Sequence, residues 1–212
     1  MIYALAVSAF LVLSAFSVEH KHTDVKREAV AQPVASSSSW TVDQSHSQIG
    51  FKVRHLGIAN VRGFFREYEV DMDFDPEDLS SLQVTATISV SSIDTGNERR
   101  DNHLRSDDFF NSEQYPSMSF TSTRVRNVEG NNFELVGNLT VRDVTKEVVL
   151  EAEFLGAGAM GENMKVGFEA MTTISRFDYN MKWDRVMEAG GLVVAEDVDI
   201  ILELEMDQAT SS

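Results

Sequence analysis

The sequence predicts an all-β fold, an eight-stranded antiparallel barrel with a short helix between its third and fourth strands. Eight segments alternate apolar and polar residues with a period of two, which is typical of half-buried strands. Turn-forming residues separate these segments, so that hairpins follow one another in series. Strands with one polar face must hide the other, in a sandwich or in a closed barrel, and serial hairpins favour the barrel.

The eight alternating segments span residues 48–54, 67–74, 82–90, 117–121, 133–141, 147–154, 166–174 and 198–207. Turns are predicted at residues 75–78, which are also compatible with a helical turn, and at residues 129–132 and 156–158. The alternation slips near Gly63, because Phe64 and Phe65 are adjacent. This slip predicts a bulge or a sharp bend.

Two segments break the alternation. Residues 97–111 predict the short helix, with Asn97 as its N-cap. Within it, the i,i+4 spacing of Asp101 and Arg105 predicts an ion pair on the helix surface. Residues 176–191 form a long excursion before the last strand, and excursions of this length are often lids or binding loops.

The composition excludes several classes of protein. The chain has 212 residues, a formal net charge of −16 and no cysteine. Without cysteine there is no disulfide, no thiol nucleophile, no Fe–S cluster and no lipoprotein anchor. Residues 1–39 are neutral overall, so the negative charge lies in the body that follows. An acidic body argues against binding to nucleic acid, which requires a basic face.

The first residues predict an export signal. Residues 2–18 carry no charge, and Ala15-Phe16-Ser17 is a small-x-small cleavage pattern. We therefore expect a signal peptide over residues 1–17, cleaved after Ser17, and a periplasmic or secreted protein. An uncleaved membrane anchor is the alternative, although the run is slightly shorter than the ~20 residues of a membrane span. Residues 18–39 predict a flexible linker, residues 40–207 the barrel domain and residues 208–212 a C-terminal tail.

Three motifs favour a structural interpretation, so we expect no catalytic residue and no metal site. Residues 156–161 match the dinucleotide pattern G-x-G-x-x-G, but a strand-like alternation follows them, so a hairpin turn is expected. The acidic run at residues 71–75 lacks the glycine and glutamate of a calcium loop. His46 lies beside Asp43 and Ser45 on one extended segment, where neighbouring side chains point to opposite faces.

The densest polar cluster lies in the predicted helix and contains Arg100 and His103. One interpretation is that these two side chains meet the polar head of a ligand at the barrel mouth, and the other is an ordinary helix surface. His55 is in phase with Ile49 and Phe51, so it is either a polar group within the apolar wall or a rim residue at the strand end.

Several motifs together resemble the YceI-like family of polyisoprenoid-binding proteins. They are Val42-Asp43-x-x-His46-Ser47-x-Ile49-x-Phe51, His55-Leu56-Gly57, Val61-x-Gly63-x-Phe65, Ser92-Ile93-x-Thr95, the segment 100–110, Tyr115-Pro116, Gly137-x-Leu139-Thr140 and Val144-Thr145-Lys146. The resemblance runs in one order over residues 40–206. It departs from the family pattern at Asp143 and Asn180, where glycine is commoner, and both positions lie in expected turns.

The resemblance implies a lipocalin-like barrel with a long apolar tunnel, in an exported protein. We therefore expect a carrier for a polyisoprenoid lipid of the quinone or polyprenyl phosphate type, which is not an enzyme and has no cofactor besides the lipid. A fatty acid or fatty amide in the same barrel is the alternative. An alternative of another class is a lipid-modifying enzyme that uses His46 or His55.

The expected partner is a long-chain apolar lipid, not a nucleic acid, while a transient membrane contact and a homodimer are left open. The residues expected to line the tunnel are Ile49, Phe51, Val53, His55, Val84, Ile88, Phe120, Leu135, Leu139, Phe168, Ala170, Ile200 and Leu202, and Arg100 and His103 are expected to meet the head group. A purely structural role would instead require an interior filled by side chains.

Overall fold

The computed structural model describes residues 38–161, 163–188 and 190–209. The predicted signal peptide and its cleavage site lie outside the described residues, as does the predicted linker up to residue 37. The first strand begins at Ser38, two residues before the predicted start of the barrel domain. The last strand ends at Gln208, one residue after its predicted end.

Within the described residues, eleven strand segments make up a single sheet. They are β1 (Ser38–Val42), β2 (Gln48–His55), β3 (Ala59–Phe65), β4 (Tyr68–Asp75), β5 (Asp78–Ser89), β6 (Ile93–Asp94), β7 (Ser117–Glu129), β8 (Asn132–Val141), β9 (Val144–Met160), β10 (Asn163–Ser175) and β11 (Val194–Gln208). The helix is α1 (Glu98–Arg105), and two 3-10 turns are η1 (Val90–Ser92) and η2 (Arg176–Tyr179).

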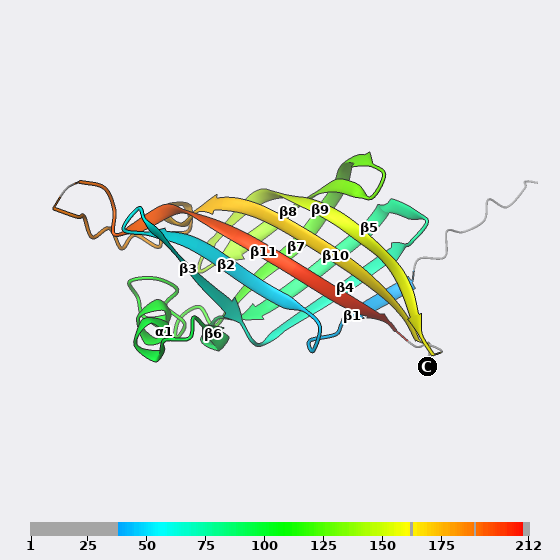
Figure 1. The fold of residues 1–212 in the computed structure, drawn as a ribbon, viewed down its shortest axis with the longest axis horizontal. Helices are drawn as coiled ribbons and strands as arrows, with labels where there is room; N and C mark the ends of the chain where they lie inside the picture. The colour runs from blue at the N-terminus through cyan, green and yellow to red at the C-terminus, as the bar shows by residue number, and fades with distance from the viewer. Residues whose placement is uncertain (1–37, 162, 189, 210–212) are drawn as a thin grey trace, which may run out of the picture. The chain divides into compact units, whose positions relative to one another are not determined.

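Hydrogen bonds close eight of these segments into an antiparallel barrel (Figure 1). The order is β1-β4-β5-β7-β8-β9-β10-β11, and β11 pairs back with β1, where Val42 faces Met206. β1 and β2 both pair with the same edge of β11, β1 with its last residues and β2 with the residues before them. β3 pairs with β2, and β6 pairs with β3. The predicted fold is therefore confirmed, including a helix between the third and fourth strands of the ring.

Two strands near the N-terminus differ from the sequence prediction. β1 was not predicted, because its short run offers only Trp40 and Val42 as alternating apolar residues. The predicted bend near Gly63 is wrong in position, since Gly63 lies within β3 opposite Phe51. The chain instead breaks between β3 and β4, at the two residues 66 and 67.

The turn predicted at residues 156–158 is also misplaced. β9 continues through these residues to Met160, and Gly156 pairs with Gly167 of β10. Gly156 has a φ of +124°, and the register shifts beside it, between Gly167 and Phe168. The glycines therefore serve a bulge inside a long hairpin, because glycine adopts positive φ without steric cost.

The turn at residues 75–78 is a tight hairpin turn rather than a helical turn. β4 ends at Asp75 and β5 begins at Asp78, so only two residues connect them. The Asp75 carboxylate accepts a hydrogen bond from the backbone N–H of Glu77 at 2.9 Å. This is the local side-chain bond by which aspartate stabilises turns.

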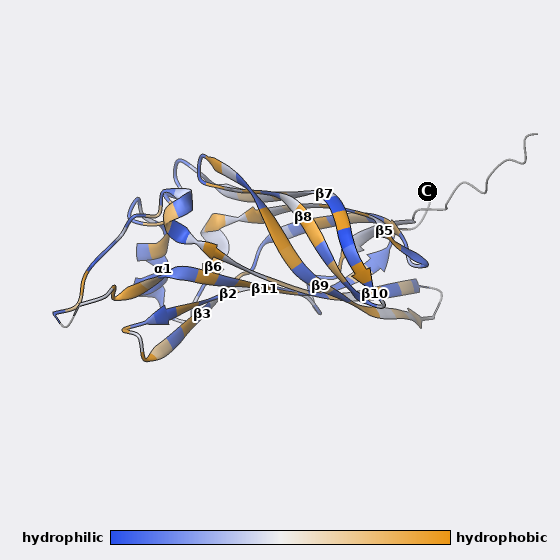
Figure 2. Cartoon of the chain, turned by 90° about the horizontal axis from the view of Figure 1, so that it is seen from above, coloured by the Kyte–Doolittle hydropathy of each residue, from blue (hydrophilic) through white to orange (hydrophobic). Residues whose placement is uncertain are grey.

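Aromatic side chains fill the barrel beside the β1–β11 pairing. The ring centroids of Trp40 and Phe74 are 5.5 Å apart, and those of Phe74 and Phe168 are 5.4 Å apart. Trp40, Phe74 and Met206 are at most 1% exposed. Hydrophobic and hydrophilic residues alternate along the strands (Figure 2), which places the apolar set inside. Packed side chains therefore close this end of the barrel.

Candidate functional site

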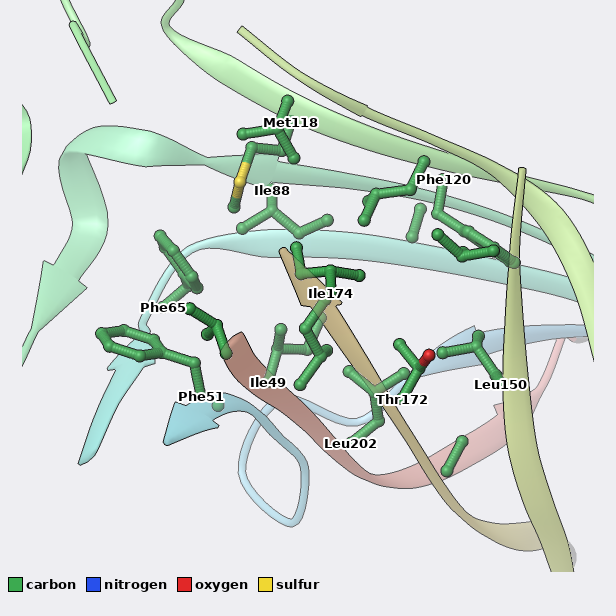
Figure 3. A pocket seen from close by; sticks show the side chains of 18 of the residues that line it. Ile49, Phe51, Phe65, Ile88, Met118, Phe120, Leu150, Thr172, Ile174 and Leu202 are labelled. Carbon is green, nitrogen blue, oxygen red and sulfur yellow. The ribbon is translucent and has the colours of Figure 1, made fainter. Parts of the chain in front are cut away.

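A cavity of about 190 Å³ lies inside the barrel. Thirty-five of the residues that the structure describes line it, and all of these except Gly50, Glu169, Thr172 and Arg176 have hydrophobic side chains. Figure 3 shows side chains from several strands pointing into this space, among them Ile88, Met118 and Ile174. The cavity offers a hydrocarbon chain an apolar environment and offers a polar group few partners.

Twelve of the thirteen residues predicted to line the tunnel line this cavity. They are Ile49, Phe51, Val53, Val84, Ile88, Phe120, Leu135, Leu139, Phe168, Ala170, Ile200 and Leu202. His55 is not among the lining residues, because it ends β2, where it pairs with Ala59 and with Val194. The structure thus places His55 at the strand end, and contact of the other twelve with a lipid stays a prediction.

Sequence reasoning missed the part of the wall that does not come from strands. Leu104 of α1 and Phe109 and Phe110 after it line the cavity. Met181, which follows η2, lines it as well. Period-two alternation cannot identify such residues, because their direction depends on how the helix and the excursion pack over the barrel.

Two phenylalanines of the wall lie against glycines of neighbouring strands. A Cβ atom at Gly63 would lie 2.5 Å from Cε1 of Phe51, and one at Gly137 would lie 2.5 Å from Cε2 of Phe120. Only a residue without a side chain lets each ring lie this close to the backbone. The rings therefore lie along the wall, which leaves space at the centre of the barrel.

Arg142 ties together three segments at the end of the barrel where the helix lies. It sits in the β8–β9 turn, and its Nη1 donates to the carbonyl oxygens of Phe109 at 2.9 Å and of Asn180 at 3.0 Å. Its Nη2 donates to Oδ1 of Asp107 at 3.2 Å. The Arg142 side chain is only 12% exposed. This guanidinium thus joins the residues after α1 to those after η2, over the cavity.

The predicted head-group residues do not line the cavity. The guanidinium of Arg100 donates from Nε to Oγ1 of Thr95 at 2.7 Å and from Nη2 to the Thr95 carbonyl at 2.9 Å. His103 Nε2 lies 2.7 Å from Oδ2 of Asp108, and its ring packs edge-on against Phe109 at 5.0 Å between centroids. Arg100 therefore supports the loop before α1, and His103 lies behind the wall residue Phe109.

The predicted ion pair between Asp101 and Arg105 is wrong. Asp101 is 6% exposed, and its carboxylate accepts hydrogen bonds from the backbone N–H and the hydroxyl of Thr95. Arg105 donates instead to the carbonyl oxygens of Ser91 and Ile93, both at 2.8 Å. Both side chains anchor α1 to residues 91–95, which precede it. The spacing of residues within the helix could not indicate these partners.

Arg176 is a buried charged residue of the wall. It is 2% exposed and donates to the carbonyl oxygens of Met181 at 2.8 Å, Ala195 at 2.9 Å and Val194 at 3.1 Å. Burial lowers the pKa of Arg176 from its ordinary value. Since its donors bind these backbone oxygens, Arg176 joins η2 to β11 and borders the cavity with its stem.

A polar cluster lies outside the cavity, where the β1–β2 connection meets β10 and β11. The Nζ atom of Lys165 lies 2.9 Å from Asp43, 2.8 Å from Glu205 and 2.7 Å from Asp207. Hydrogen bonds from Ser45, His46 and Lys165 hold the pKa of Asp43 well below its usual range. Asp43, His46 and Glu205 are close enough to share a cation, and the ammonium of Lys165 already bonds to two of them.

The structure brings Ser45, His46 and Asp43 together, which sequence reasoning did not expect. They lie in a turn rather than along a strand. The Ser45 hydroxyl and the Asp43 carboxylate both contact Nδ1 of His46, at 3.0 Å and 2.9 Å. A nucleophile relay needs the serine and the carboxylate on opposite ring nitrogens, so this geometry differs from a Ser-His-Asp triad.

In the part of the chain that the structure describes, no helix combines the length and apolar character of a membrane span.

The chain is similar to proteins of known sequence over most of its length. The model of the YceI-like domain matches residues 40–206. A UPF0312 protein of Staphylococcus epidermidis is 39% identical over 163 residues, which are 76% of this chain and 92% of that protein. A UPF0312 protein of Photorhabdus laumondii is 37% identical over 169 residues, which are 78% of this chain and 88% of that protein.

Solved structures resemble the barrel as a whole. The YceI protein of Campylobacter jejuni superposes with a TM-score of 0.65 at 33% identity and covers 80% of this chain and 97% of its own. A polyisoprenoid-binding domain from Saccharophagus degradans superposes with a TM-score of 0.61 over 81% of this chain and 99% of its own. Its identity is 14%, so this likeness shows the fold alone.

Proposed function

This chain belongs to the YceI-like family, and we propose that it is an exported protein that carries a polyisoprenoid lipid in its barrel. The observation that carries the proposal is the cavity inside the barrel with its almost wholly apolar wall. Burial of hydrocarbon there is worth about 0.8 kcal/mol for each CH₂ relative to water. Relative to a membrane this gain nearly cancels, which suits a protein that exchanges its lipid with a bilayer.

The size of the cavity sets a condition on long ligands. Its volume of about 190 Å³ is below the roughly 300–1,000 Å³ of typical small-molecule sites. A long isoprenoid chain therefore requires lining side chains to move. Met72, Met118 and Met181 lie in the wall, and unbranched methionine side chains adapt to irregular spaces more readily than other apolar residues.

The polar end of the ligand is expected to lie outside the cavity. Arg176 uses its donors on backbone oxygens, and Arg100 and His103 do not line the wall. In this proposal the protein therefore recognises the hydrocarbon chain of the lipid rather than its head group. We propose a quinone or polyprenyl phosphate as the ligand. If the test below finds a fatty acid or fatty amide instead, that lipid replaces it.

A carrier is favoured over a lipid-modifying enzyme, because neither histidine of that alternative lines the cavity. His46 is in the polar cluster with Asp43 and Lys165, and His55 is at the end of β2. The apolar leader at the start of the sequence supports the proposal that the protein is exported. A homodimer stays a prediction.

The test is identification of the bound molecule. The full chain, with its leader, is produced in a bacterium that makes polyisoprenoids, purified without detergent and analysed by native mass spectrometry and solvent extraction. We expect one isoprenoid lipid per chain. Extraction of a fatty acid or fatty amide would replace the ligand, and a protein that stays empty even when offered quinones, polyprenyl phosphates and fatty amides would contradict the proposal.

A further inference from the structure

The hairpin between β2 and β3 ends in exposed apolar residues. Ile58 is 83% exposed and Leu56 is 40% exposed. Leu56 also has a φ of +53°, in the left-handed region that favours glycine or asparagine. A large apolar side chain in such a position is unfavourable both to the backbone and to the solvation of the tip, which suggests a use outside the isolated molecule.

A third exposed apolar residue lies on a neighbouring segment. Val186 is 64% exposed and belongs to the excursion between η2 and β11. This excursion is joined to the hairpin, because the backbone N–H of Leu56 donates to the carbonyl of Val193 at 2.8 Å. Both segments lie at the same end of the barrel (Figure 1), and the tip of the hairpin is hydrophobic (Figure 2). We refer to residues 54–62 and 182–188 together as the tip surface.

The tip surface is positively charged in a chain whose net charge is −16. Arg54 and Arg62 are exposed, and residues 54–62 contain no aspartate or glutamate. Three acids of β11 lie beside the hairpin. Glu196 and Asp197 fall between Val194, the partner of His55, and Val198, the partner of Val53, and the Ser175 hydroxyl donates to Glu196 at 2.7 Å. Asp199 is held by Lys52 at 2.9 Å. In residues 182–188 the two acids, Asp184 and Glu188, are balanced by two bases, Lys182 and Arg185.

The opposite hairpin gives the contrast. Val128, near the turn between β7 and β8, is 45% exposed. Its neighbour is Glu129, and the nearby Arg126 is paired with Glu134 at 2.6 Å. Exposed apolar residues thus occur on both hairpins, but of these two the tip surface is the one whose own residues carry a net positive charge.

We propose that the tip surface docks onto a bilayer of anionic phospholipid. Ile58, Leu56 and Val186 enter the interface between head groups and acyl chains, and Arg54 and Arg62 meet the phosphates. Such a combination of apolar insertion and basic charge is what binds proteins to anionic membranes. The proposal rests on the proposed function, because Met181 and Val194, which flank the excursion, line the cavity and bring its wall next to the membrane.

The experiment measures co-sedimentation of the purified chain with vesicles of phosphatidylcholine, with and without phosphatidylglycerol. We expect the chain to bind the anionic vesicles more tightly. Ile58→Asn is expected to weaken binding about tenfold, since an exposed apolar anchor is lost. Arg54→Gln and Arg62→Gln are each expected to weaken it about fivefold, on anionic vesicles only. Val128→Asn, the matched control, is expected to bind as the parent chain does.

Three outcomes would overturn the docking proposal. They are no binding of the parent chain to anionic vesicles, equal binding of Ile58→Asn and Val128→Asn, and a change in oligomeric state of Ile58→Asn without a change in vesicle binding. The last would make the tip surface a contact between copies of the chain. Native mass spectrometry of the same samples separates the two proposals, because a parent chain that binds vesicles but never holds lipid contradicts the carrier function and leaves the docking intact.

Discussion

The ring of Phe120 lies against Gly137, so closely that a Cβ atom at residue 137 would lie 2.5 Å from Cε2 of the ring. The added Cβ atom would also lie 2.7 Å from the carbonyl oxygen of Thr121. One of these neighbours is backbone, which cannot rotate away as a side chain can. Phe120 and Gly137 therefore form a unit that shapes the cavity wall.

Gly137→Ala is expected to destabilise the protein by about 1–3 kcal/mol, the usual cost of overpacking a well-packed interior. Urea denaturation followed by tryptophan fluorescence measures this change. Gly158→Ala is the control, because no atom lies within 4 Å of a Cβ at that position. A Gly137→Ala protein as stable as the control would contradict the close approach.

Thr172→Phe is expected to fill the cavity and weaken lipid binding. The clash with a bound lipid, about 1–3 kcal/mol, corresponds to a loss of roughly five- to 150-fold in affinity. Met171→Phe is the matched control, since Met171 directly precedes Thr172 in β10 and is 46% exposed on the outer face. Titration with a fluorescent polyprenyl analogue compares the two variants, and equal affinities would place the ligand elsewhere.

Arg142→Ala is expected to lower the free energy of unfolding by about 2–3 kcal/mol, because it leaves the carbonyls of Phe109 and Asn180 without their charged donor. Hydrogen exchange should rise in residues 106–112 and 176–181. Arg142→Lys should restore little, since lysine lacks the planar fork. Arg124→Ala, which breaks an exposed pair with Glu147, should cost less than about 1 kcal/mol. Equal losses of unfolding free energy in Arg142→Ala and Arg124→Ala would contradict the role of Arg142 in joining these segments.

His46 is expected to make stability depend on pH. Its hydrogen bond to Asp43 and the charges of Asp43 and Glu205 raise the pKa of His46 above its ordinary value of 6.5. A group whose pKa is raised by folding stabilises the protein fully below its unfolded pKa and loses that contribution as pH rises through its folded pKa.

The free energy of unfolding should therefore fall as pH rises above about 6.5. Urea denaturation at a series of pH values measures this fall. His46→Gln should remove it, whereas His55→Gln, outside the Asp43 cluster, should keep it. An unchanged pH profile in His46→Gln would show that the contact with Asp43 does not stabilise the fold.

Periodicity predicted most of the wall, because alternation assigns each strand residue to one face before any partner strand is known. Twelve of the thirteen predicted lining residues accordingly lie on the cavity. The exception, His55, is in phase with the others and pairs with the lining residue Val194, but it stands at the last position of β2 and does not itself line the cavity. The same alternation could not place the end of a strand.

Spacing within a segment failed where the true partner is far along the chain. Asp101 and Arg105 have helical spacing but bond to Thr95 and to carbonyls of residues 91 and 93. Ser45 and His46 were expected on opposite faces of a strand, and a turn places both on Asp43.

The amino-acid pattern alone was sufficient for the all-β class, the inward and outward faces and the apolar nature of the interior, since these follow from the pleat of each strand and from burial of hydrocarbon. Tertiary packing decided how much of that interior stays empty, which rings lie along the wall, and which segments cover the end of the barrel. Those properties depend on contacts such as Arg142 with Asn180 or Phe120 with Gly137, and such contacts exist only once distant strands are hydrogen-bonded in a single register.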